Sequence, residues 1–252
     1  MVDSTFRVVI PARFASTRFP GKALAKLAGK PMIQHVYERA LSSHAEAVIV
    51  ATDDERIADA SRKFGATVLM TCASHQSGTD RVAEVAEQLG WPSDSVVVNV
   101  QGDVPLIPCA SINQVAQLLV DSTPAGIATL CAPITTSTEY HDANVVKVVF
   151  DASGRALYFS RAAIPSSVGD PGRATQDFSI QAWRHIGIYA YRVQTLNQLT
   201  ITEPCMLENY EKLEQLRALW NGMEIRVGVA AQAHGPDVDT PQDLAAAEKY
   251  LI

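Results

Sequence analysis

The sequence lacks the features that mark secreted, disulfide-rich and membrane proteins. Its 252 residues include only four cysteines, Cys72, Cys109, Cys131 and Cys205, which lie far apart and form no CxxC pair. We therefore expect free thiols, no structural zinc and a reducing, cytoplasmic location. No apolar run approaches the length of a membrane span, and the apolar run near Met1 is too short for a signal peptide.

Positive charge is also scarce. The chain has 21 Lys and Arg against 27 Asp and Glu, a net charge of −6. This balance argues against a nucleic-acid-binding surface, because phosphate backbones favour clustered cations. One short stretch is the exception, with Arg13, Arg18, Lys22, Lys26 and Lys30. Such a cluster suits a small polyanion better than a polymer, although a solvated basic face would have the same composition.

Hydrophobic residues are plentiful, at 47% of the chain, which is enough to build the core of one large domain. Short apolar runs alternate with helix-like segments along the first hundred residues. The runs are residues 6–10, 47–51, 67–70 and 95–100, and the segments between them are 32–42, 54–64 and 79–89. This alternation predicts an α/β fold with a doubly wound, mostly parallel, Rossmann-like sheet. Its ligands are expected at the carboxyl ends of the strands.

The middle of the chain has a different pattern. Strand-like runs at 145–150, 156–160 and 187–191 are joined by a turn and by the polar loop 165–181. We expect a single domain over residues 1–252 that carries a β-rich excursion at about 133–200, which serves as a lid, a dimer contact or both.

The last part of the chain returns to helix and strand patterns. Residues 206–220 predict a helix and residues 224–229 a strand. Residues 240–250 predict a closing helix, with Thr240 as its N-cap and Pro241 at its first position.

A candidate phosphate site is the loop after the first predicted strand, IPARFASTRFPGK at residues 10–22. Its small residues let the backbone approach a ligand, and Arg13, Arg18 and Lys22 can neutralise phosphate oxygens. The loop matches neither the GxGxxG fingerprint nor the P-loop. An ordinary strand-to-helix loop with solvated arginines remains the alternative.

Two aspartates are candidate metal ligands. Asp103 follows a buried strand in VNVQGDVP, residues 98–105, and Asp239 precedes the last predicted helix in DVDTP, residues 237–241. A carboxylate in such a position suits Mg²⁺, which prefers one or two carboxylates together with phosphate oxygens. Turn chemistry would explain either residue equally well. Asp239 gains meaning only if the fold brings it opposite Asp103.

Two further polar groups could contact a ligand. The loop SHQSGTDR, residues 74–81, can present hydroxyls and backbone groups to a base or ribose, although Thr79 would equally serve as a helix cap. A second, scattered group of residues has side chains that would suit a polyhydroxylated acid. Each member also has an ordinary structural explanation, and nothing in the sequence alone groups them. Its members are Arg161, His185, Tyr189, Glu214 and Gln215.

Taken in order, the motifs resemble those of the 3-deoxy-manno-octulosonate (KDO) cytidylyltransferases, the CMP-KDO synthetases of lipopolysaccharide assembly. The likeness covers nearly the whole chain. Its most specific pieces are IPARFASTRFPGK, GKPMIQHV, ATDD, HQSGTDR, VNVQGD, NVVKVV, ALYFSRAAIP, RHIGIYAYR, LEQLRALW and VDTPQDL.

The resemblance implies a homodimeric enzyme that uses CTP, KDO and Mg²⁺. Asp103 and Asp239 would bind the metal, and catalysis would rest on them together with Lys22 and Arg13. The second, scattered group would line the sugar-acid pocket. Nucleotide contacts are implied for Pro11, Ala12, Arg13, Arg18, Lys22, Gln76, Ser77, Gly78 and Gln101.

The implied reaction is in-line attack by the anomeric hydroxyl of KDO on the α-phosphorus of CTP, which gives CMP-KDO and pyrophosphate.

The sequence departs from the family pattern at three positions. Val104 stands where the family usually has Glu, so we expect two metal aspartates rather than a third acid. Cys72 and Ser74 replace the Arg and Asp often found before HQSG. Two alternatives stay open: a synthetase for another acidic sugar, such as sialic acid, and a nucleotide-binding protein without turnover.

Overall fold

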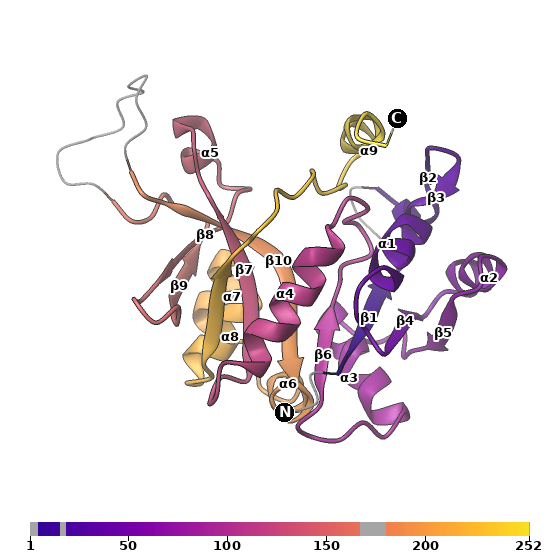
Figure 1. Ribbon diagram of the computed structural model, residues 1–252, viewed down its shortest axis with the longest axis horizontal. Helices are drawn as coiled ribbons and strands as arrows, with labels where there is room; N and C mark the ends of the chain where they lie inside the picture. The colour runs from indigo at the N-terminus through magenta and orange to yellow at the C-terminus, as the bar shows by residue number, and fades with distance from the viewer. Residues whose placement is uncertain (1–4, 16–18, 167–179, 252) are drawn as a thin grey trace.

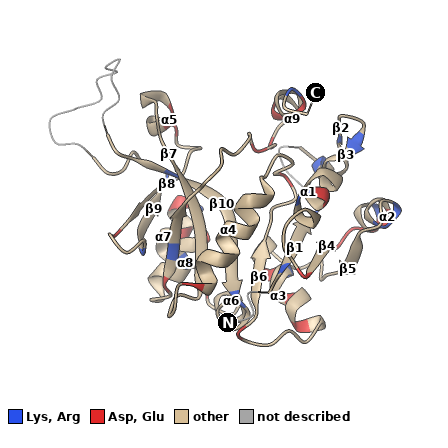
Figure 2. Cartoon of the chain, in the orientation of Figure 1, with Lys and Arg blue, Asp and Glu red and all other residues tan. Residues whose placement is uncertain are grey.

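One large mixed sheet organises the protein (Figure 1). The computed structural model describes residues 5–15, 19–166 and 180–251. Within these residues the sheet has nine strands. Its main path runs in the order β11-β7-β10-β6-β1-β4-β5, and β8 and β9 are attached beside β10. Figure 2 shows that the central strands are largely free of charged residues, which concentrate on helices and loops.

The first half of the chain forms the parallel part of the sheet, as predicted. β1 (Phe6–Ala12) lies between β4 (Ala47–Thr52) and β6 (Val96–Asn99), and β5 (Thr67–Met70) follows at the edge. The connecting helices α1 (Met32–Leu41), α2 (Glu55–Lys63) and α3 (Gly78–Gln88) also agree with the prediction.

Alternate residues of β1 enter two different cores. Val8 and Ile10 pack with α1 and with α4 (Cys109–Val120) on one face, whereas Val9 packs with α3 on the other. Burial on both faces explains why these strands are almost continuously apolar. The prediction of a doubly wound α/β fold is confirmed.

The second half of the chain adds antiparallel pairing. β10 (Trp183–Arg192) is inserted between β6 and β7 (Ile127–Pro133) and runs antiparallel to both. β8 (Lys147–Phe150) and β9 (Ala156–Ser160) form a hairpin whose pairing with β10 is at Arg184 and Lys147. β10 is longer than the predicted strand at 187–191, and it belongs to the main sheet.

The predicted helix at 206–220 is wrong in one respect, because the segment forms two short helices. α7 (Met206–Glu211) ends at Lys212, whose φ of 54° is left-handed, and α8 (Gln215–Trp220) begins after it. Leu213, between them, is buried in the core. Glu214 and Gln215 therefore stand at the start of a separate helix, α8.

The last segment folds back over the carboxyl ends of the parallel strands. After β11 (Ile225–Val229) the chain crosses the sheet, and the Val238 amide donates to the carbonyl of Asp103 at 3.0 Å. α9 (Pro241–Glu248) then begins as predicted, with Thr240 as N-cap and Pro241 in its first turn. α9 packs near the hairpin of β2 (Lys26–Leu27) and β3 (Lys30–Pro31). This return brings the C-terminal part of the chain to the predicted ligand edge.

Candidate functional site

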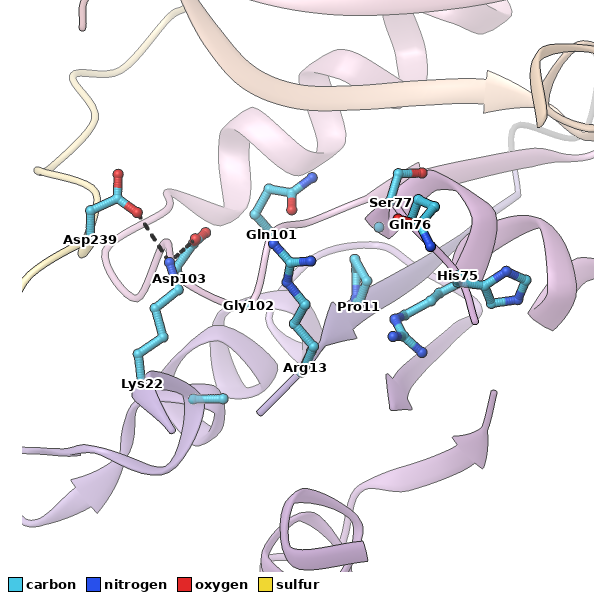
Figure 3. Close-up of a pocket in the computed structure, with 14 residues that line it drawn as sticks. Pro11, Arg13, Lys22, His75, Gln76, Ser77, Gln101, Gly102, Asp103 and Asp239 are labelled. Atoms are coloured by element: carbon cyan, nitrogen blue, oxygen red, sulfur yellow. Dashed lines mark hydrogen bonds and ion pairs between the residues drawn. The ribbon is translucent and has the colours of Figure 1, made fainter. Parts of the chain in front are cut away.

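A cavity of about 280 Å³ opens at the carboxyl ends of β1 and β6 (Figure 3). The structure brings together in its wall nearly all the residues predicted to contact nucleotide or metal. The predicted residues that line it are Pro11, Ala12, Arg13, Lys22, Gln76, Ser77, Gly78, Gln101, Asp103 and Asp239. Arg18 lies outside the described residues.

Lys22 and the two predicted metal ligands form one charged cluster. The Nζ atom of Lys22 lies 2.5 Å from Asp103 Oδ2 and 3.1 Å from Asp239 Oδ1, as the dashed lines in Figure 3 show. Burial alone would lower the pKa of Lys22, but the charges and hydrogen bonds of Asp103 and Asp239 outweigh it and raise that pKa. Lys22 is therefore a cation held between two carboxylates.

Glycines make the close approach of these segments possible. A Cβ on Gly102 would lie 3.0 Å from the carbonyl oxygen of Pro11, and one on Gly78 would lie 3.1 Å from the Pro11 ring. Gly21, which precedes Lys22, has a φ of 72°. Gly78 and Gly102 thus let their segments pack closely against Pro11, and the positive φ of Gly21 is one that glycine adopts without strain.

Asp237 is an acid of this region that the sequence analysis did not assign. Burial, followed by the negative charges of Asp103 and Asp239, raises the pKa of Asp237 to about 6. The only signal in the sequence was its place in DVDTP. Across 5–15, 19–166 and 180–251, no group of three or more His, Cys, Asp or Glu residues is arranged to hold a metal ion. The two metal ligands predicted from the sequence, Asp103 and Asp239, stay a prediction.

The N-terminus of α3 forms another wall of the cavity. Ser77 is the N-cap of α3, and its Oγ accepts from the amide of Asp80 at 3.1 Å. Thr79, the residue considered as a cap, lies inside the helix. His75 and Arg81 also line the cavity and were not predicted. Both contact carboxylates: His75 Nε2 lies 2.6 Å from Glu84 Oε2, and Arg81 Nη2 lies 2.8 Å from Asp53 Oδ2.

A second cavity, of about 220 Å³, adjoins the first and shares Gly78 and Gln101 with it. Three residues predicted for a sugar acid line it: Tyr189, Glu214 and Gln215. Asn99 and Tyr191 line it too, although the sequence analysis did not assign them to a substrate. Thr79, which was considered for a base or ribose or as a helix cap, lines this second cavity as well.

Two polar groups in the wall of this second cavity are buried, and their burial costs desolvation energy. The hydroxyl of Tyr189 is buried and has no hydrogen-bond partner among the described residues. Burial raises the pKa of Glu214, and hydrogen bonding to Thr79 and the charge of Arg217 only partly oppose the rise. Buried polar groups of this kind are expected where a ligand completes the hydrogen bonding.

The other two residues of the predicted sugar pocket, His185 and Arg161, are not among the described residues that line either cavity. His185 lies beside Tyr189, with ring centroids 5.3 Å apart, and its Nε2 is 2.9 Å from the Thr129 hydroxyl. Burial lowers the pKa of His185 to about 3, so the imidazole is neutral at pH 7. Arg161 donates from Nε to the carbonyl of Glu211 at 2.7 Å and from Nη1 to that of Ala143 at 3.0 Å.

Comparison with known proteins agrees with this geometry. Residues 7–225 match the cytidylyltransferase family. The 3-deoxy-manno-octulosonate cytidylyltransferase of Thioalkalivibrio sulfidiphilus is 54% identical over 98% of this chain and 99% of its own, and that of Marinobacter nauticus is 56% identical over 96% and 95%. The chain belongs to the 3-deoxy-manno-octulosonate cytidylyltransferase family. The resemblance found in the sequence motifs is thus confirmed.

Solved structures extend the likeness to three dimensions. A structure of CMP:2-keto-3-deoxy-manno-octonic acid synthetase complexed with CTP is 41% identical, covers 98% of both chains and has a TM-score of 0.88. A cytidylyltransferase from Leptospira borgpetersenii shares only 16% identity, with a TM-score of 0.63 over 98% of this chain and 88% of its own, and so supports the fold alone. In the present protein, none of the helices within the described residues is long and apolar enough to cross a membrane.

The unpaired hydroxyl of Tyr189 leads to a prediction about stability. Tyr189→Phe removes a buried group that has no described partner, so the free energy of unfolding should stay the same or rise. Tyr140→Phe is the matched control, because the Tyr140 hydroxyl donates to the carbonyl of Pro165 at 2.6 Å. The control should lose about 1 kcal/mol. Urea unfolding of both variants measures the difference, and an equal loss in both would show that the Tyr189 hydroxyl is satisfied in the protein.

Proposed function

We propose that the protein transfers CMP from CTP to the anomeric hydroxyl of KDO, giving CMP-KDO and pyrophosphate for lipopolysaccharide synthesis. The observation that carries the proposal is the pair of adjoining cavities, which meet at Gly78 and Gln101. One holds the cationic and carboxylate cluster, and the other holds the unpaired Tyr189 hydroxyl and the buried Glu214 carboxyl. The names of the relatives and the CTP of the similar solved structure support this choice of substrates.

The first cavity suits a nucleoside triphosphate. Arg13 and Lys22 line it on one side and can neutralise phosphate oxygens. Gln76 and Ser77 lie on the α3 side, where amide and hydroxyl groups can contact the cytidine. We assign Arg18 to the triphosphate on the motif alone, since it falls outside the described residues.

The second cavity suits a polyhydroxylated acid. The Tyr189 hydroxyl needs a partner, and a sugar hydroxyl would supply one. Glu214 and Gln215 face the same space from the start of α8 and can accept from or donate to further hydroxyls. His185 would act here by supporting the Tyr189 ring. Arg161 is assigned to the sugar acid on the family resemblance alone, because it is not among the described residues that line either cavity.

Magnesium fits the residues that the fold brings together. Asp103 and Asp239 offer hard oxygen ligands beside a cavity suited to phosphates, and their side chains are 29% and 39% exposed, so water and substrate oxygens could complete the shell. When bound, Mg²⁺ would neutralise phosphate charge and lower the pKa of the attacking hydroxyl. The protein's own groups would do the rest by positioning.

The chemistry needs the two substrates to be held in line. Gln101 borders both cavities, so it lies where the sugar hydroxyl and the α-phosphate would meet. Lys22 and Arg13 would stabilise charge on the α-phosphate and on the departing pyrophosphate. His185 is neutral and lines neither cavity, so we do not assign it the role of general base. Proximity and charge neutralisation would supply most of the rate.

We also propose a homodimer in the cytoplasm. The family resemblance supports the dimer, and the four free cysteines suit a reducing compartment. The hairpin of β8 and β9 is the proposed contact, because Leu157 on β9 is 53% exposed.

Light scattering should give about twice the chain mass of 27.2 kDa. A mass of one chain, at the concentrations used for activity assays, would contradict the dimer.

The substrate assignment is tested by a panel of acceptors. The protein is incubated with CTP, Mg²⁺ and either KDO, an amino-substituted KDO or sialic acid, and pyrophosphate release is measured. We expect KDO to give the highest kcat/KM. Preference for another acid would correct the acceptor, and CTP binding without pyrophosphate release for any acceptor would indicate a nucleotide-binding protein without turnover.

The metal assignment is tested by Asp103→Asn. This change keeps the size of the side chain but removes a charged ligand, so kcat should fall by at least about 10²-fold while the unfolding temperature changes little. Asp121→Asn is the control, since Asp121 is an exposed residue at the end of α4 that accepts from Gln117. Near-normal pyrophosphate release from Asp103→Asn at saturating Mg²⁺ would rule out the assignment.

A further inference from the structure

The position of the Lys22 ammonium is more specific than a general role in phosphate binding requires. Its Nζ lies within hydrogen-bond distance of Asp103 Oδ2, Asp239 Oδ1 and the carbonyl oxygen of Val238. An ammonium has three N–H donors, so these three acceptors account for all of them. The side chain is 16% exposed. Lys22 thus lies at the point where both carboxylates converge.

A divalent cation held by Asp103 and Asp239 would use the same carboxylates. Two like charges that share one pair of carboxylates repel each other, and a divalent ion doubles the repulsion that a monovalent one would produce. The ammonium and the divalent cation therefore cannot both be held between these two side chains. One must leave when the other binds.

The backbone around Lys22 allows such an exchange without a change of fold. Lys22 begins a short 3₁₀ turn (Lys22–Leu24), in which the amide of Ala25 donates to the Lys22 carbonyl at 3.1 Å. The side chain already lines the cavity proposed for CTP. A lysine side chain has a flexible stem of four carbons. Rotation about the bonds of this stem alone could carry the ammonium from the carboxylates into the cavity.

We infer that Lys22 occupies the site of the divalent cation and that binding of the cation releases Lys22 to the triphosphate. This inference rests on the proposed function, and it adds an order to it: the metal frees the lysine that binds the nucleotide. Lys22 and the metal then compete for Asp103 and Asp239, whereas the metal and the triphosphate help each other. Such coupling between two ligands is reciprocal.

The first test measures binding of Mn²⁺ alone, by electron paramagnetic resonance of the free ion. Lys22→Met removes the competing ammonium, so Mn²⁺ should bind at least about tenfold more tightly, equivalent to about 1.4 kcal/mol. Lys26→Met is the matched control, because Lys26 is an exposed lysine of the same segment. It should change the Mn²⁺ affinity less than about twofold, as expected for a screened surface charge. Lys22→Gln serves as a second variant if Lys22→Met unfolds.

The outcomes separate this inference from the metal assignment itself. If Asp103→Asn and Asp239→Asn weaken Mn²⁺ binding but Lys22→Met leaves the affinity equal to that of Lys26→Met, the exchange is wrong and the metal site stands. If neither Asn variant affects Mn²⁺ binding, the metal assignment fails and the exchange fails with it.

The second test measures CTP binding by calorimetry, with Mg²⁺ or with EDTA. Lys22 should contribute to CTP binding chiefly when the metal has released it. Lys22→Met should therefore weaken CTP binding at least about tenfold with Mg²⁺, and less than about threefold with EDTA. Equal losses under both conditions would overturn the inference, because Lys22 would then reach the nucleotide whether or not the metal is present.

Discussion

The site depends on the return of the C-terminal segment to the edge of the sheet. The hydrogen bond from the Val238 amide to the Asp103 carbonyl fixes this return, and Val238 is fully buried with Leu27, Met32 and Ala247. Asp239, the next residue, is thereby placed beside Asp103, although 136 positions separate them in the chain. Without this contact the two carboxylates would belong to unrelated loops. The charge of Lys22 offsets the repulsion that their approach creates.

The parts of the fold that were predictable are those with a local cause. The strands and helices of the parallel half follow from short-range apolar patterns, and the start of α9 follows from the side chains of Thr240 and Pro241. The loop after β1 and the aspartate after β6 were found because ligands of such sheets lie at the carboxyl ends of strands. The pairing of Asp103 with Asp239 had no local signal, and only the family resemblance implied it.

The features that the sequence did not show are those that packing decides. The segment after Cys205 has a helical pattern throughout, but burial of Leu213 favours a turn at Lys212 over a continuous helix. Nothing near Asp237 indicated that burial, together with the charges of two other carboxylates, would raise its pKa to about 6. The backbone contacts of the Arg161 guanidinium with Glu211 and Ala143 had no signal in the sequence either, and the role of Arg161 toward the sugar acid stays a prediction. Each depends on residues distant in the sequence.

The pairing of β6 with β10 links the two cavities. In this antiparallel pair Tyr189 lies opposite Asn99, two residues before Gln101, so one register sets the positions of a sugar-pocket residue and of the residue shared by both cavities. A shift by one residue would turn Tyr189 to the other face of the sheet. Gly78 keeps the wall at the other shared position thin, because a side chain there would press on the Pro11 ring. The pairing of the strands therefore sets the distance between the two proposed substrates, whereas the inferred exchange at Lys22 needs only a change of its side-chain rotamer.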